Sequence, residues 1–203
     1  MRDGEIRHAL LQQLAADHAH DPDTRVWPEL SLCLGEARVD VGVVNGALSG
    51  FEIKSARDRL TRLPRQREVY ERCLDYVTIV IEERWSPTLA SHVPEWWGVI
   101  VARQSGSRVM LDDVRPALRN SSVDPLAVAQ LLWRDEAAAV VMDRGIRERT
   151  SRLTRWDLWD LLVEHLTLDE LACTVRNHLR ARPVREATAL PTPDGAMSRS
   201  TAT

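Results

Sequence analysis

The sequence is poor in lysine. Lys54 is its only lysine among 27 basic residues, so arginine supplies all the others. Lysine carries a compact ammonium group whose pKa shifts readily, whereas arginine is a planar fork that stays charged. The count alone does not choose between a bias toward arginine and a position that needs lysine chemistry. It does single out position 54 for inspection.

The chain also lacks several features that would identify a protein class. Its three cysteines, Cys33, Cys73 and Cys173, are far apart and form no CxxC pair, which excludes a disulfide framework and argues against a cysteine zinc site. No run approaches the roughly 20 apolar residues of a membrane span, and the mixed charges of residues 1–7 lead into no signal-peptide core. We expect a cytoplasmic protein without membrane association. No Ser-His-Asp or Cys-His arrangement and no glycine-rich phosphate loop is present.

The composition is that of an ordinary globular protein. With 203 residues, 44% of them apolar and 28% charged, the chain can bury a core without a disulfide or a structural metal. Its net charge of -3 argues against binding nucleic acid by bulk charge. Any binding to a polyanion would need a local basic patch.

Hydrophobic periodicity predicts an α/β organisation. The first part is expected to contain helices over 4–16 and 64–73 and extended segments or strands over 26–34, 37–44, 48–54, 76–82, 96–102 and 108–111. Helices are expected over 124–143, 154–165 and 168–181. The predicted division is therefore an α/β core over 1–112, a helical C-terminal extension over 113–182 and a flexible tail over 183–203.

The most informative segment is a hairpin that carries charged residues. Glu52 and Lys54 are two apart on a strand and share one face, and Asp40 lies between two valines of the preceding strand. A two-residue loop would place Asp40 opposite Phe51, whereas a three-residue loop, Asn45-Gly46-Ala47, would place it opposite Glu52. We predict the three-residue loop, with Gly46 in the left-handed conformation.

Two carboxylates held this close need to be neutralised. Unit charges 4 Å apart repel by about 4 kcal/mol at an effective dielectric constant of 20. One carboxyl group could hold a proton, or a divalent cation such as Mg²⁺ or Mn²⁺ could lie between Asp40 and Glu52. Such a metal would activate water, and Lys54 could stabilise charge that develops on a phosphate. The alternative is an ordinary Glu-x-Lys strand beside a stray buried aspartate.

The order α-β-β-β-α-β, with Asp…Glu-x-Lys on the second and third strands, resembles the PD-(D/E)XK phosphodiesterase superfamily. The resemblance covers about residues 4–82 and implies a restriction-endonuclease-like core with a mixed sheet. It implies metal binding by Asp40 and Glu52 and a catalytic role for Asp40, Glu52 and Lys54. Val39 stands where that superfamily usually has proline. The opening Met-Arg-Asp-Gly-Glu-Ile-Arg and the run Glu-Ile-Lys-Ser…Arg-Leu-Pro-Arg-Gln…Tyr are similar to a group of small bacterial proteins placed there.

The resemblance suggests further site residues. Gln66 and Tyr70 are four apart on the predicted helix and share a face, and their spacing is similar to a substrate-positioning motif of RecB-type nucleases. An upstream glutamate completes the metal shell in many members, which favours Glu29. Glu5 on the first helix is the weaker alternative, because it could equally be a solvated charge near a helix N-terminus.

A basic patch adjoins these residues in the sequence. Residues 57–72 hold six arginines against three acidic residues, and we expect Arg57, Arg59, Arg62 and Arg65 to contact phosphates. The sequence therefore predicts a Mg²⁺- or Mn²⁺-dependent nuclease acting on nucleic acid, with DNA favoured by the resemblance. The alternatives are a non-catalytic nucleic-acid-binding or complex-assembly protein that keeps the fold, and an adaptor whose C-terminal helices bind a protein.

Overall fold

The computed structural model describes residues 1–183 except 56, 59, 86–88 and 90–92. Its strands form one six-stranded mixed sheet in the order β1-β2-β3-β4-β5-β6. The strands are β1 (Arg25–Leu32), β2 (Ala37–Val44), β3 (Leu48–Lys54), β4 (Tyr76–Glu82), β5 (Gly98–Ser105) and β6 (Arg108–Arg115). The pairs β3–β4 and β4–β5 are parallel, and the other three pairs are antiparallel. The predicted α/β class with a mixed sheet is confirmed.

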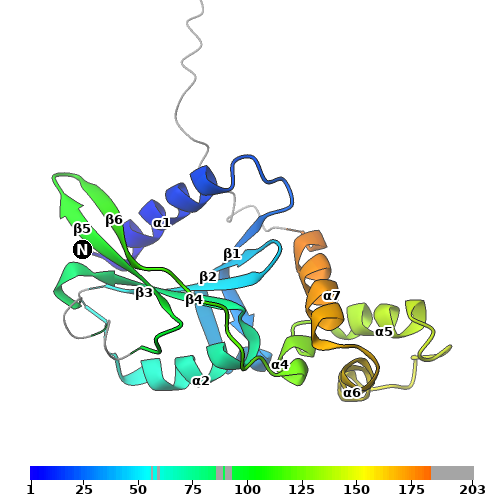
Figure 1. Cartoon of the computed structure of the whole chain (residues 1–203). Helices are drawn as coiled ribbons and strands as arrows, with labels where there is room; N and C mark the ends of the chain where they lie inside the picture. The colour runs from blue at the N-terminus through cyan, green and yellow to red at the C-terminus, as the bar shows by residue number, and fades with distance from the viewer. Residues whose placement is uncertain (56, 59, 86–88, 90–92, 184–203) are drawn as a thin grey trace, which may run out of the picture.

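The described helices lie on both faces of the sheet (Figure 1). They are α1 (Asp3–Asp17), α2 (Leu63–Cys73), α4 (Pro125–Ala129), α5 (Arg134–Asp143), α6 (Arg155–His165) and α7 (Leu168–Ala181), with short 3-10 turns η1 (Cys33–Gly35), η2 (Leu60–Arg62) and η3 (Glu83–Trp85). None of the helices among these described residues is long and apolar enough to cross a membrane.

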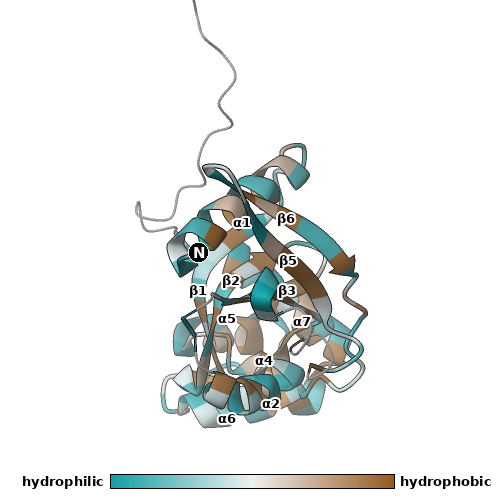
Figure 2. Ribbon diagram, turned by 90° about the vertical axis from the view of Figure 1, so that its left-hand side faces the viewer, coloured by the Kyte–Doolittle hydropathy of each residue, from teal (hydrophilic) through white to brown (hydrophobic). Residues whose placement is uncertain are grey.

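Two hydrophobic clusters hold the layers together. On one face, α1 buries Ile6, Leu10 and Leu14 against strand residues that include Val41 and Ile53. Figure 2 shows α1 with both hydrophobic and hydrophilic residues, as expected for a helix with a single buried face. On the other face, one continuous cluster joins the sheet to α2 and to α4–α7. The helical C-terminal part therefore packs on the sheet.

The β2–β3 hairpin has the predicted register. Val44 pairs with Leu48 and Val41 with Phe51, so three residues connect the strands. The prediction that Gly46 adopts the left-handed conformation is wrong, because the positive-φ glycines in the described chain are at positions 35, 106 and 145. The side chain of Asn45 closes the turn instead, with its Oδ1 accepting from the Ala47 N–H at 3.0 Å.

Two other predictions differ from the structure. The helix predicted over 124–143 is two helices, α4 and α5, because Trp133 is extended and its N–H donates to the Glu136 carboxylate at 2.7 Å, which starts a new helix. β6 continues to Arg115, so the predicted limit at residue 112 falls within that strand. The two-part division stays a prediction, and residues 184–203 of the predicted tail lie outside the described chain.

Candidate binding cleft

A cleft of about 680 Å³ opens beside the β2–β3 hairpin and the start of α2. We refer to it as the cleft. Its basic lining residues are Arg7, Arg38, Lys54, Arg62 and Arg65, and its acidic ones are Asp3, Glu29, Glu36, Asp40, Glu52 and Asp58. The cleft therefore mixes charges of both signs, and how they pair decides what it can bind.

Asp40 joins α1, β2 and β3. Its Oδ1 accepts a hydrogen bond from the Arg7 guanidinium at 2.7 Å, and its Oδ2 accepts one from the Ile53 backbone N–H at 2.8 Å. Arg7 also donates to the Asp40 backbone carbonyl at 2.7 Å. Burial alone would lower the pKa of Arg7, but the hydrogen bond and charge of Asp40 raise it above its ordinary value. The Arg7–Asp40 pair is therefore a stable ion pair at the wall of the cleft.

Glu52 is the centre of a second, more deeply buried network. Its side chain is 2% exposed, and its Oε1 accepts from Lys54 Nζ and from Gln66 Nε2, the latter at 2.7 Å. Its Oε2 accepts from the Tyr70 hydroxyl at 2.6 Å. Lys54 Nζ also donates to Gln66 Oε1 at 3.1 Å. Glu52, Lys54, Gln66 and Tyr70 thus satisfy one another, which a buried charge pair requires.

The burial of this network shifts two pKa values. Burial raises the pKa of Glu52 above its ordinary value, Lys54 opposes that shift, and the charge of Asp40 adds to it. Burial, followed by the charge of Glu52, raises the pKa of the Tyr70 hydroxyl far above its ordinary value. Tyr70 therefore acts here as a hydrogen-bond donor that holds Glu52 in place.

The raised pKa of Glu52 predicts a pH dependence of stability. Between the unfolded-state pKa, about 4.3, and the higher folded-state pKa, the folded protein binds more protons than the unfolded chain. The contribution of Glu52 to the free energy of unfolding should therefore decrease as the pH rises through this window. Urea unfolding at several pH values should show this decrease in the wild type and lack it in Glu52→Gln. Equal slopes in both proteins would contradict the assignment to Glu52.

The structure brings most of the predicted side chains together. Asp40, Glu52, Lys54 and Gln66 line the cleft, and Tyr70 lies directly behind them. Glu29 also lines the cleft, but its side chain is more than half exposed and pairs with Arg38 at 3.3 Å. The alternative residue Glu5 does not line the cleft, and its carboxylate accepts a hydrogen bond from the Arg2 N–H at the start of α1.

The predicted arginines divide into three groups. Arg62 and Arg65 line the cleft, Arg57 is exposed but does not line it, and Arg59 lies outside the described residues. Sequence reasoning missed Arg7 and Arg38. The position of Asp40 between two valines indicated that a cation should neutralise its carboxylate. No local sequence spacing, however, links a residue of the first helix such as Arg7 to that strand.

The carboxylates proposed as metal ligands are all engaged by protein donors in the structure. Both oxygens of Asp40 and both oxygens of Glu52 already accept hydrogen bonds, and Glu29 is paired with Arg38. Within the described part of the chain, no three histidine, cysteine, aspartate or glutamate side chains are grouped so that they could hold a metal ion. Binding of Mg²⁺ or Mn²⁺ at Asp40, Glu52 and Glu29 stays a prediction, and it would require the cation to displace some of these donors.

Comparison with known proteins places the chain near a phage family. A family model described as "Bacteriophage P4 protein cII" matches residues 1–190. The "Protein cII" of Enterobacteria phage P4 is 25% identical over 171 residues, which cover 84% of this chain and 64% of that protein. The chain thus spans slightly less than two thirds of the length of this relative. No solved structure gave a significant match.

These matches overturn the interpretation of the chain as a nuclease. The family model that covers almost the whole chain is that of P4 protein cII, so the assignment to the PD-(D/E)XK superfamily and the prediction of a Mg²⁺- or Mn²⁺-dependent hydrolase are wrong. The Asp…Glu-x-Lys pattern misled because it is short. Here Asp40, Glu52 and Lys54 satisfy a structural need, since they pair with Arg7 and with each other.

Proposed function

We propose a function from the premise that the chain belongs to the bacteriophage P4 protein cII family: it binds nucleic acid through the cleft without catalysing a reaction. The proposal concerns the region that the chain shares with its phage relative, which is 64% of that protein's length. DNA is the partner we expect first, and RNA is an arm of the test.

One observation carries the proposal. Arg38, Arg62 and Arg65 come from β2, η2 and α2, yet all three line one cleft. The side chains of Arg38 and Arg65 are 62% and 64% exposed. Arg62 is exposed and forms no ion pair with any residue in the described ranges. Guanidinium groups presented in this way match the two oxygens of a phosphate.

The deeper charges of the cleft support the same reading. Asp40 is neutralised by Arg7 and Glu52 by Lys54, so the inner wall adds little repulsion toward a phosphate. Among the described residues, the outer arginines pair with exposed acids: Arg38 with Glu29, and Arg65 with Glu36 and Glu68. Exposed pairs of this kind contribute about 0–1 kcal/mol, so a phosphate can replace the carboxylate partner.

The arrangement of the first elements fits the same proposal at the level of fold. We infer that α1-β1-β2-β3-α2-β4 forms a restriction-endonuclease-like core, used here as a scaffold. The strand order supports this inference, because two antiparallel pairs, β1–β2 and β2–β3, are followed by the parallel pair β3–β4. The packing of α1 and α2 in different hydrophobic clusters supports it as well. A fold of this kind implies no activity by itself, because function resides in the site.

Binding should depend on salt and on Arg62. Fluorescence anisotropy would measure the affinity for labelled single-stranded DNA, double-stranded DNA and RNA across a range of salt concentrations. Log K falls as log salt rises because each phosphate contact releases counterions, so Arg62→Ala should make this negative slope shallower by about one. Parallel titrations in EDTA, Mg²⁺ and Mn²⁺ test whether a metal ion at Asp40, Glu52 and Glu29 contributes to binding.

A matched control separates the cleft from general charge. Arg152, exposed between α5 and α6 and outside the cleft, would be changed to alanine and should leave the salt slope unchanged. Equal losses in the two variants would argue against the cleft as the binding site. If the wild type bound none of the three nucleic acids, the complex-assembly alternative would replace this proposal.

A further inference from the structure

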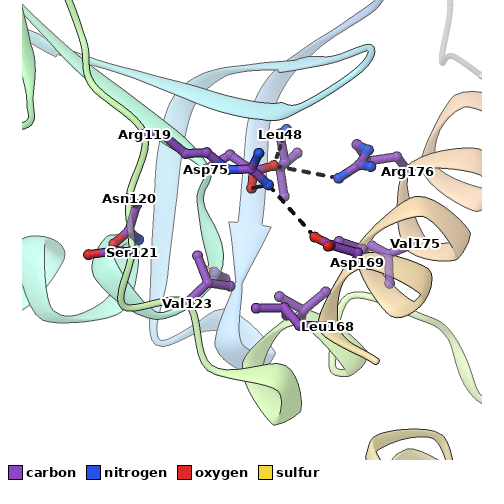
Figure 3. A pocket seen from close by; sticks show the side chains of 13 residues that line it. Leu48, Asp75, Arg119, Asn120, Ser121, Val123, Leu168, Asp169, Val175 and Arg176 are labelled. Atoms are coloured by element: carbon purple, nitrogen blue, oxygen red, sulfur yellow. Dashed lines mark hydrogen bonds and ion pairs between the residues drawn. The ribbon is translucent and has the colours of Figure 1, made fainter. Parts of the chain in front are cut away.

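A second, smaller pocket lies between the sheet and α7 (Figure 3). We refer to it as the α7 pocket. Its volume is about 160 Å³, and it shares no lining residue with the cleft. Figure 3 shows Asp75, Arg119 and Arg176 at one end of it and Val123 and Leu168 at the other. One end is therefore charged and the other is apolar.

Asp75 is a buried carboxylate with few close partners. The residue is 9% exposed, and its Oδ2 accepts a hydrogen bond from the Leu48 N–H at 2.8 Å. Its other neighbours are guanidinium groups at longer range, Arg176 at 3.6 Å and Arg119 at 4.0 Å. A buried charge needs hydrogen bonds as well as a counter-charge, and Oδ1 has no donor at hydrogen-bond distance among the described residues.

The guanidinium groups of Arg119 and Arg176 likewise have no short hydrogen bonds within the described residues. Arg119 approaches Asp75 and Asp169 only at 4.0 Å and 3.9 Å, and Arg176 approaches Asp75 at 3.6 Å. N–H···O hydrogen bonds have lengths of about 2.7–3.2 Å, so these contacts are ion pairs without hydrogen bonds. Neither guanidinium donates a hydrogen bond to any residue that the structure describes. The N–H groups of Arg119 and Arg176 and the Oδ1 atom of Asp75 are thus available to hydrogen-bond a ligand in the α7 pocket.

The size and lining of the α7 pocket restrict its ligand. A volume of 160 Å³ is about that of five liquid water molecules, so a small metabolite fits and a drug-sized molecule does not. The apolar end is formed by Val123, Val128, Leu168 and Val175, which suits a short hydrocarbon group. The charged end holds two guanidinium groups and two carboxylates, so its own charge is balanced.

We propose that the α7 pocket binds a small amino acid with an apolar side chain, as the zwitterion. Its carboxylate would accept hydrogen bonds from Arg119 and Arg176, and its ammonium would donate to Asp75 and Asp169. A plain anion would leave Oδ1 of Asp75 without a hydrogen-bond donor, and a plain amine would leave both guanidinium groups without a hydrogen-bond acceptor. The zwitterion alone replaces the long ion pairs with short hydrogen bonds and adds no net charge.

Titration calorimetry with matched ligands tests the proposal. L-Valine and L-leucine are the probes; isovalerate lacks the ammonium group, and isobutylamine lacks the carboxylate. We expect saturable binding of at least one amino acid, and binding at least about tenfold weaker for isovalerate and isobutylamine, because each lacks a charge-assisted hydrogen-bonding group. Saturable binding of neither amino acid, or equal binding of isovalerate, would overturn the proposal.

Two variants locate the binding. Arg119 is mostly exposed, so Arg119→Gln should fold, and it should weaken amino-acid binding by about tenfold or more. Arg180→Gln, on α7 but outside the α7 pocket, should leave the affinity unchanged. Equal effects of both changes would place the ligand elsewhere and overturn the proposal. Nucleic-acid affinity, measured in parallel, should be the same in both variants, because the proposal does not depend on the cleft.

Discussion

Lys54→Met should lower the free energy of unfolding at neutral pH by about 3–5 kcal/mol, because it would leave Glu52 as a buried carboxylate without its counter-charge. The Glu52 side chain is 2% exposed and that of Lys54 is 5% exposed, so water cannot replace the lost ammonium group. Gln66 and Tyr70 would still donate hydrogen bonds but carry no positive charge. Urea unfolding followed by circular dichroism would measure the loss.

Two controls identify the cause of that loss. In Glu52→Gln/Lys54→Met both charges are absent, so most of the lost stability should return. Arg65→Met, which removes a cation from a mostly exposed pair, should change the free energy of unfolding by less than about 1 kcal/mol. The loss in Lys54→Met should also shrink as the pH falls, because the pKa of Glu52 is raised by burial and the carboxylate then takes up a proton. A loss as small as that of Arg65→Met would refute the buried-pair account.

The local geometry of the cleft was predictable from the sequence because it follows from short-range rules. Asn45-Gly46-Ala47 sets the hairpin register, and that register places Asp40 near Glu52. The spacing of four residues brings Gln66 and Tyr70 to one helix face, and both donate hydrogen bonds to the Glu52 carboxylate. Hairpin loop length and helix spacing both depend on residues that are close in the sequence, so both can be predicted from a short segment.

The partners from distant segments could not be predicted in the same way. Arg7 reaches Asp40 across 33 positions of sequence, and only the packing of α1 on the sheet brings the two side chains together. The prediction of a nuclease was wrong for a related reason. A buried Asp…Glu-x-Lys set can be a catalytic centre or a self-neutralised ion-pair network, and the residue types are the same in both. The motif alone therefore could not support the nuclease interpretation, which the family match overturned.

Trp159→Ala should have the other large effect, and it also tests how the two parts of the chain depend on each other. Trp159 is 2% exposed on α6, and its indole N–H donates to the Leu132 carbonyl at 3.2 Å. Removing a buried tryptophan of this kind costs about 3–5 kcal/mol. Its hydrophobic cluster runs without a break from the C-terminal helices to Ile79 and Ile81 of β4. The strands should therefore lose stability together with α6 and α7.

Hydrogen exchange measured on peptides from β3–β4 and from α6–α7 would separate the possibilities. If the sheet and helices unfold as one cooperative unit, Trp159→Ala should reduce the protection of both sets of peptides by the same free energy. Trp156→Ala serves as the matched control on the same helix, because Trp156 is 45% exposed and its loss should cost only about 1 kcal/mol. If the strands kept wild-type protection while α6 and α7 lost theirs, the predicted division into a core and a helical extension would describe two separately stable units, because the shared cluster would not couple them.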